Sequence, residues 1–193
     1  ILIIVISTSG YGQKTNLLPG FIITNSNDTL RGVLDYKSNA QNSMSCTFIN
    51  GIANTRHTYS PEDIKAFKIE NNKYYVAKDI TIDGTKSRVF LEYLVDGIVD
   101  LYYLSDAFNE YYFIENDTSM IQLSNKETKV FRKGDGIRTN DKEFTSHSNQ
   151  YKGALRYAFK DSPGLSDKIT NTAFEYKALV RITKEYHESV CRD

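Results

Sequence analysis

Glu92 is the acid whose surroundings in this sequence best suit catalysis. It lies in the middle of an apolar run, Val89–Val95, that has the length of a strand. Burial of a carboxyl group disfavours its charged form, and acids perturbed in this way act as general acids or bases in hydrolases. Asp100 lies in the next predicted strand, and its side chain would point to the opposite face of the sheet from Glu92. These two acids would therefore not form a pair. We therefore expect Glu92 to be a buried acid that binds a tyrosine hydroxyl or an arginine, with catalysis as the alternative.

The sequence has three tyrosine doublets, at residues 74–75, 102–103 and 111–112, which could bind a ligand through their aromatic rings. Successive side chains of a strand point to opposite faces, so each doublet places one ring on each face of a sheet. Aromatic rings at a surface suit contact with a glycan or a partner protein. One ring from each doublet would form such a surface: Tyr75, Tyr103 and Tyr112. The alternative is ordinary sheet packing, because tyrosine is frequent in strands.

The sequence contains no recognisable metal or cofactor motif. Neither of its two cysteines belongs to a zinc-site spacing, and its three histidines lie far apart, at His57, His147 and His187. The acids near Asp79 and Asp83 lack the alternation of a calcium loop. Gly134-Asp135-Gly136 lacks the lysine and hydroxyl residue of a phosphate-binding loop. We expect no cofactor and no metal.

The charge balance argues against a nucleic-acid partner. Lysine plus arginine and aspartate plus glutamate number 24 each, and no basic stripe interrupts this balance. The aromatic residues comprise fourteen tyrosines, ten phenylalanines and no tryptophan, a composition that favours β-structure.

The first twelve residues have the pattern of a truncated signal peptide. Ile1–Ile6 is uninterruptedly apolar, and small residues follow, with Gly10 and Gly12 suitably placed for cleavage before Gln13. A buried first strand is the alternative for the same run. The run is shorter than the roughly 20 residues of a membrane-spanning helix. We expect an exported protein that is periplasmic, secreted or at the cell surface and does not span the membrane after processing.

Export would expose Cys46 and Cys191 to an oxidising compartment, where they could form a disulfide. The alternative is one buried thiol and one thiol in the C-terminal tail.

Residues 20–124 read as short strands joined by tight turns, which predicts an antiparallel meander. The clearest turn is Asp96-Gly97, where a two-residue type I′ bend would place Glu92 opposite Leu101. Both faces of this hairpin are apolar, so we expect it to be central and covered on both sides.

Two further turns join the strands that precede this hairpin. Asp83-Gly84 would place Asp79 opposite Arg88 as a surface ion pair. A two-residue turn at Asn71-Asn72 would put Phe67 on the same face as Tyr74, and Lys73 on the same face as Tyr75, Lys68 and Glu70.

Helical spacing of apolar residues predicts helices within 148–190, after a polar loop over Lys133–Ser146. Thr172–Glu175 has the form of a capping box that would start the last helix. The expected fold class is α+β, with an antiparallel meander sheet, curled or partly closed into a barrel, and C-terminal helices packed on one face. Residues 13–193 would form a single domain.

Several motifs resemble exported proteins of Bacteroidetes that have no known function and whose N-terminal region sometimes precedes an outer-membrane β-barrel. The matching segments are Gly20–Thr24, Asp28–Val33, Tyr59–Ile64, Phe90–Gly97 and Leu101–Tyr103. Asn27 and Ser162 depart from the family pattern, where glycine and cysteine are usual, and no barrel strands follow Asp193. If Asp193 is the native end, the resemblance implies a stand-alone periplasmic, secreted or surface form of the domain, and it supplies no catalytic residue.

Three functions follow as hypotheses. The first is a non-enzymatic interaction module that binds an outer-membrane or surface partner protein or a glycan, and it predicts an exposed aromatic or apolar patch. The alternative is a glycan-directed hydrolase that uses buried carboxylates, which predicts a cleft with two carboxyl groups about 5 to 9.5 Å apart. The third is a structural spacer with neither patch nor cleft.

Overall fold

The computed structural model describes residues 16–51, 54–132 and 142–191. The expected signal peptide at residues 1–12 lies outside them. The described strands are β1 (Leu17–Thr24), β2 (Thr29–Asp35), β3 (Cys46–Asn50), β4 (Arg56–Tyr59), β5 (Ile64–Ile69), β6 (Tyr74–Ile82), β7 (Thr85–Val95), β8 (Asp100–Ser105), β9 (Glu110–Glu115), β10 (Met120–Leu123), β11 (Glu127–Arg132) and β12 (Lys142–His147). The helices are α1 (Asn39–Asn42), α2 (Gln150–Ala158), the 3-10 turn η1 (Pro163–Leu165), α3 (Ser166–Asn171) and α4 (Tyr176–Val190).

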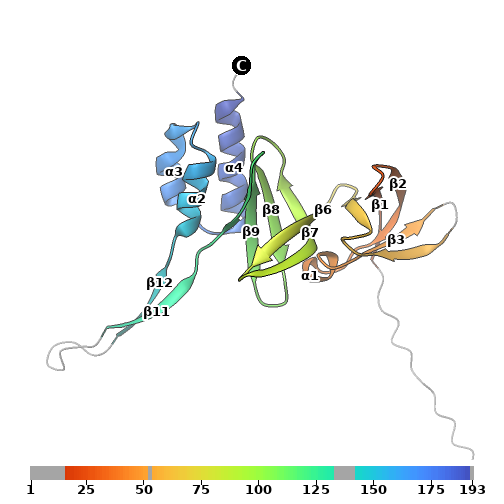
Figure 1. The fold of residues 1–193 in the computed structure, drawn as a ribbon, viewed down its shortest axis with the longest axis horizontal. Coiled ribbons are helices and arrows are strands. Elements are labelled where there is room, and N and C mark those ends of the chain that lie inside the picture. Colours follow the sequence, from red (N-terminus) through yellow and green to blue (C-terminus); the bar gives the residue numbers. More distant parts are fainter. Residues whose placement is uncertain (1–15, 52–53, 133–141, 192–193) are drawn as a thin grey trace, which may run out of the picture.

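Ten of these strands form one antiparallel sheet in the order β10-β9-β8-β7-β6-β5-β1-β2-β3-β4. All its neighbouring strands are consecutive in the chain except β5 and β1, so the sheet is a meander with one rearranged connection. The sheet is not closed, and the helices α2, α3 and α4 lie at one end of the molecule (Figure 1). The expected α+β class, with a curled meander and C-terminal helices, is confirmed.

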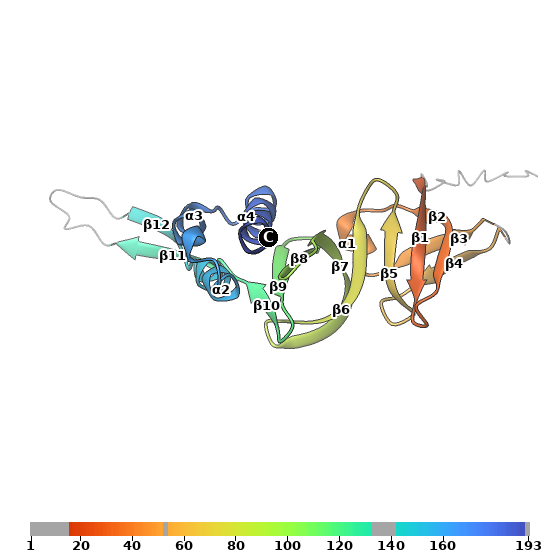
Figure 2. The ribbon, with the colours of Figure 1, turned by 90° about the horizontal axis from the view of Figure 1, so that it is seen from above.

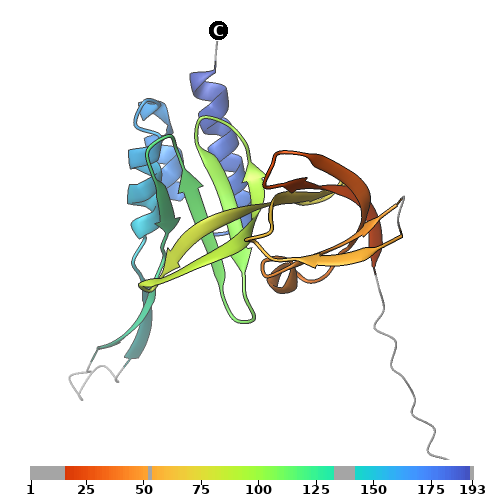
Figure 3. The same ribbon diagram turned by 45° about the vertical axis from the view of Figure 1, so that its right-hand side comes forward.

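The sheet curls toward opposite faces in its two halves. Seen from above, β6–β10 follow one arc and β1–β5 another (Figure 2), and Figure 3 shows the second arc as an open ring. The inside of the first arc is filled by Leu91, Tyr102, Phe113 and their neighbours. The inside of the second arc holds Phe67 and Phe90, which belong to the opposite face of the sheet.

The helices cover the outer face of the first arc. Leu155 of α2 and Leu179 of α4 are fully buried against Leu101 and Ile114 of the sheet. The β7–β8 pair is therefore covered on both faces, as its apolar composition predicts. One continuous face of the sheet thus carries the helices at one end and the core of the second arc at the other.

The last helix begins three residues later than the capping box predicts. Tyr176 is its first residue, and Glu175 precedes it in an extended conformation without a side-chain cap. Thr172 instead donates its hydroxyl hydrogen to the carbonyl of Lys168, at 2.8 Å. The threonine therefore ends α3 rather than starting α4, and this frees Tyr176 to lie at the tip of α4.

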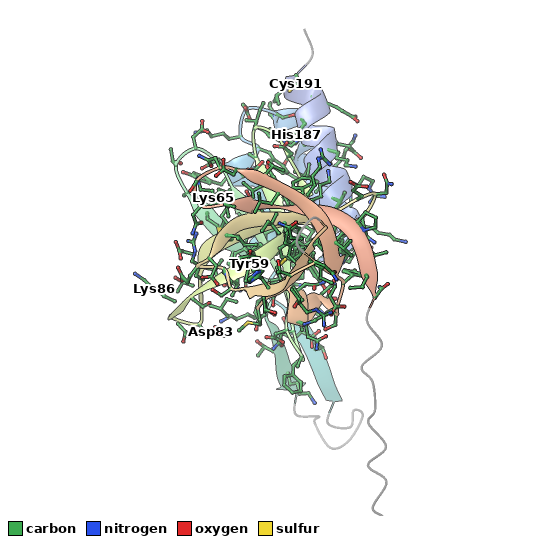
Figure 4. The ribbon with its side chains drawn as sticks, turned by 90° about the vertical axis from the view of Figure 1, so that its right-hand side faces the viewer. Tyr59, Lys65, Asp83, Lys86, His187 and Cys191 are labelled. Carbon is green, nitrogen blue, oxygen red and sulfur yellow. The ribbon has the colours of Figure 1, made fainter. Side chains whose placement is uncertain are left out.

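The Asp83-Gly84 turn forms as expected. Both residues have positive φ, and Asp79 lies opposite Arg88 with an ion pair of 2.8 Å. Figure 4 shows Asp83 at the outer tip of this hairpin. The segment Lys133–Ser146, expected as a loop, includes most of β12, which forms a hairpin with β11. Its Gly134–Gly136 stretch lies outside the described residues.

The Asn71-Asn72 turn has a different register from the one predicted. Ile69 donates its backbone N–H to the carbonyl of Lys73, at 3.0 Å, so three residues rather than two make the bend. Asn71 has a positive φ, which a longer turn of this kind accommodates. Phe67 consequently pairs with Tyr75, not Tyr74, and the predicted faces are wrong by one residue. This shift places Lys73 on the face that carries the buried core.

The β7–β8 connection is also wider than predicted. Glu92 pairs with Tyr103 rather than Leu101, with a bulge between Tyr93 and Val95. Neither Asp96 nor Gly97 has the positive φ of a type I′ turn. The shift is two residues at Glu92 and Tyr93, so these two side chains keep their predicted faces. Beyond the bulge, Val95 lies with Leu101 on the face that the helices cover.

Contacts with α4 and within the loop hold this wider bend open. The Gly97 N–H donates to the Asp100 carboxylate at 3.1 Å, and the His187 ring on α4 lies within 3.0 Å of the Val99 carbonyl. His187 also occupies the space that a side chain at position 97 would need. Gly97 is therefore required by helix packing and not by its φ angle.

Both cysteines are free, so the disulfide considered from the sequence is wrong for this structure. Cys46 is buried in β3, whereas Cys191 is exposed at the end of α4 (Figure 4). Burial raises the pKa of the Cys46 thiol to about 12, which keeps it protonated and unreactive.

Candidate functional site

The three tyrosines proposed as an exposed aromatic surface are all buried. Tyr75, Tyr103 and Tyr112 are 1%, 6% and 1% exposed, so they cannot form a docking surface. Tyr75 stacks on Phe67, and the other two donate their hydroxyl hydrogens to Glu110. Ordinary sheet packing, the alternative from the sequence, is what the structure contains.

Glu92 is a buried acid, as expected, and its side chain is 3% exposed. Its Oε1 accepts a hydrogen bond of 3.0 Å from the Tyr176 hydroxyl, and its Oε2 forms an ion pair of 2.7 Å with Lys73 Nζ. The expected tyrosine partner is present, and the cation is a lysine rather than an arginine. Both carboxylate oxygens therefore have a partner.

Lys73 connects Glu92 to the short helix α1. Its Nζ donates to Asn39 Oδ1 at 2.8 Å, and the same oxygen accepts from the Tyr75 hydroxyl at 3.2 Å. Asn39 is the first residue of α1, whose start is fixed by a capping box between Ser38 and Gln41. The Lys73 side chain is 24% exposed, so it links the buried network to the surface.

A cleft of about 530 Å³ opens above this network. β6 pairs with β7 only as far as Glu92, whereas β7 continues to Val95. This leaves a space beside the unpaired end of β7, and Tyr176, the first residue of α4, bounds that space. In Figure 1, β6 and β7 lie between the helices and the N-terminal strands. The lining residues are Lys68, Asn72, Lys73, Tyr74, Glu92, Tyr93, Leu94, Asp96 and Tyr176.

Three partly exposed tyrosines line the cleft from two sides. Tyr176 lies on the face of the sheet that carries Glu92, and Tyr74 and Tyr93 lie on the face that carries Asp100. The rings of Tyr74 and Tyr93 are neighbours, with centroids 5.8 Å apart, and Tyr176 is 38% exposed. Lys68 Nζ lies 5.9 Å from the centre of the Tyr74 ring. The Tyr93 hydroxyl lies 2.8 Å from an oxygen of Asp96 and 2.6 Å from one of Asp100, so the two acids share its hydrogen and Asp96 is held at the rim.

The charges in the cleft are balanced. Lys68 and Lys73 stand against Glu92 and Asp96. Burial raises the pKa of Tyr176, and the negative charge of Glu92 raises it further, so the phenol stays neutral and acts as a donor. Among the described residues, no buried side-chain nitrogen or oxygen lacks a hydrogen-bond partner. The floor of the cleft is therefore satisfied without a ligand.

Asp100 lies on the other face of the sheet, as predicted. It accepts hydrogen bonds from Tyr93 at 2.6 Å and Tyr102 at 3.0 Å, and Tyr102 also contacts Glu115 at 2.9 Å. Glu92 and Asp100 thus belong to separate networks and form no acid–base pair.

The sequence did not indicate Lys73 and Tyr176 as the partners of Glu92, or Asn39 as the partner of Lys73. The signal for Lys73 was the Asn71-Asn72 turn, whose register is ambiguous by one residue. Tyr176 was expected inside the last helix rather than at its tip, and no helix was predicted over 39–42. Helix capping and turn length therefore decide the composition of this site.

Other site types find less support in the described part of the chain. No group of three or more histidine, cysteine, aspartate or glutamate side chains there is arranged to hold a metal ion. No helix among those residues has both the length and the apolar character needed to cross a bilayer.

Comparison of the chain with protein-family models, with curated proteins and with solved structures gave no match.

Proposed function

We propose that this chain is an exported, non-enzymatic binding domain that holds a polar ligand in the cleft above Glu92. The observation that carries the proposal is the combination of a preformed cleft of about 530 Å³ with a fully hydrogen-bonded floor. Volumes of roughly 300 to 1,000 Å³ are usual for small-molecule sites, which are largely formed before the ligand arrives. The occupant is a glycan or a polar segment of a surface partner.

The state of Glu92 favours binding over hydrolysis. A catalytic carboxyl group must reach the substrate, whereas both oxygens of Glu92 are engaged and its side chain is 3% exposed. The specific observation in favour of a hydrolase is that Asp96 lines the same cleft and could supply a second carboxyl group. Its contact with Tyr93 suits an orienting role at the rim.

Export is the part of the proposal that comes from the sequence. The apolar run Ile1–Ile6 and the small residues before Gln13 support it. Processing at that site would deliver the domain to the periplasm, the cell surface or the medium. Mass spectrometry of the protein from an envelope or medium fraction tests this, because the processed chain begins at Gln13 and an unprocessed one retains Ile1–Gly12.

Amide NMR with a mixed fragment library tests where ligands bind. Separate pools of monosaccharides, amino acids, nucleosides and short peptides are added to labelled protein. We expect at least one pool to shift signals around Asn72–Tyr74, Tyr93–Asp96 and Tyr176. A competing hollow lies between α3 and α4, where Asp167 and Arg181 line it. Shifts confined to that hollow, or no shift with any pool, would refute the proposal.

A further inference from the structure

The chemistry of the cleft lining selects one ligand class. A saccharide has apolar C–H faces and a rim of hydroxyl groups that both donate and accept hydrogen bonds. Its binding site therefore needs aromatic faces together with donors and acceptors, and no net charge. We infer that the cleft above Glu92 binds an uncharged saccharide, an inference that rests on the proposed binding function.

The aromatic requirement is met by Tyr74, Tyr93 and Tyr176. Tyr176 on α4 lies on the Glu92 side of the cleft, Tyr74 on β6 and Tyr93 on β7 lie on its other side, and each ring is partly exposed there. Tyr93 is held from behind by stacking on Tyr102, with centroids 4.8 Å apart. Tyr176 is held by an edge-to-face contact with Tyr103 at 5.5 Å. Rings with fixed positions lose little entropy when they bind a ligand.

The polar requirement is met by groups of both kinds. Lys73 has three N–H donors and makes two contacts with described residues, to Glu92 and Asn39. Asn72 at the rim has donors and acceptors, and Asp96 accepts. An anionic ligand would meet Glu92 and Asp96, and a cationic one would meet Lys68 and Lys73. The balance of two positive and two negative side chains in this lining favours a neutral ligand.

Isothermal titration calorimetry tests the inference. The probes are neutral tetrasaccharides of glucose, galactose, mannose and N-acetylglucosamine, a tetrasaccharide of galacturonic acid, and lysine-rich and glutamate-rich tetrapeptides. We expect at least one neutral tetrasaccharide to bind more tightly than the three charged probes. Replacement of an aromatic anchor by alanine, in Tyr176→Ala or Tyr74→Ala, should weaken that binding about tenfold or more.

The chain offers a matched control in Tyr157. Its ring lies on α2, away from the cleft, and Lys160 Nζ is 5.9 Å from its centre, the same distance as Lys68 from the centre of Tyr74. Tyr157→Ala should leave the affinity unchanged. Tyr176→Phe keeps the ring while removing the hydroxyl contact with Glu92, so it should lower the affinity less than Tyr176→Ala. Circular dichroism checks that each variant is folded.

The outcomes separate this inference from the proposed function. Binding of a charged probe alone, with loss in Tyr74→Ala and Tyr176→Ala, overturns the ligand class and leaves the binding function standing. No binding of any probe overturns the saccharide inference. Saccharide binding that is unchanged in both cleft variants overturns the inference and the assigned site. Release of reducing ends from a bound tetrasaccharide overturns the non-enzymatic function and supports the ligand class.

Discussion

Removal of the Lys73 charge should destabilise the protein strongly. In Lys73→Met, the Glu92 carboxylate stays buried at 3% exposure and keeps only the Tyr176 hydroxyl as a partner. An uncompensated buried charge costs about 3–5 kcal/mol of unfolding free energy. The double variant Lys73→Met/Glu92→Leu removes both charges and should be more stable than Lys73→Met alone.

The molecule contains its own control for this prediction. Lys168 and Glu185 form an ion pair of the same length, 2.7 Å, but their side chains are 61% and 29% exposed. Lys168→Met should therefore cost no more than about 1 kcal/mol, as is usual for exposed pairs. The difference between the two methionine variants isolates the effect of burial, because residue type and distance are matched.

Urea unfolding measures these differences. The protein has fourteen tyrosines and no tryptophan, so tyrosine fluorescence and circular dichroism are suitable probes. A change in the midpoint at constant slope reports a change in stability. If Lys73→Met and Lys168→Met shift the midpoint equally, or if the double variant is less stable than Lys73→Met, the buried network does not exist as described.

Three further predictions concern the surroundings of the site. Gly97→Ala should cost about 1–3 kcal/mol because its methyl group collides with His187, and thermal unfolding should show partial recovery in Gly97→Ala/His187→Ala. The Cys191 thiol should react with Ellman's reagent in the native protein, whereas Cys46 should react only after unfolding. Rapid reaction of both thiols in the native protein would contradict the burial of Cys46 in β3. Burial and Glu92 raise the pKa of Tyr176 in the folded state, so its contribution to stability is complete below the unfolded value of about 10 and is lost at higher pH. Above that pH, Tyr176→Phe should lose stability less steeply than the wild type in urea titrations, and equal slopes would contradict the shift.

Local turn chemistry predicted part of the fold well. Asp83-Gly84 supplies two residues that adopt positive φ, and this fixes the pairing of Asp79 with Arg88. The apolar runs on either side of Asp96 also indicated a central hairpin covered on both faces, which the two core clusters confirm. These features depend on residues close together in the sequence.

Features that depend on distant contacts could not be predicted in the same way. The wide β7–β8 bend depends on His187, which lies far along the chain on α4. The position of Tyr176 depends instead on a local choice between two roles of Thr172, which ends the preceding helix rather than capping the last one. Glu92 was recognisable as a buried acid from its apolar neighbours, but its two partners, Lys73 and Tyr176, come from the β5–β6 turn and from α4. The tyrosines that the sequence suggested for binding are in the core, because strand propensity does not distinguish a buried face from an exposed one.

A crystal structure of the protein soaked with the tightest-binding neutral tetrasaccharide tests the central claim most directly. We predict a sugar ring against Tyr74 or Tyr176, with hydroxyl groups bonded to Lys73 or Asp96 and the Glu92–Lys73 pair intact beneath it. A sugar bound only in the hollow between α3 and α4, or a Glu92 side chain open to solvent, would contradict the account.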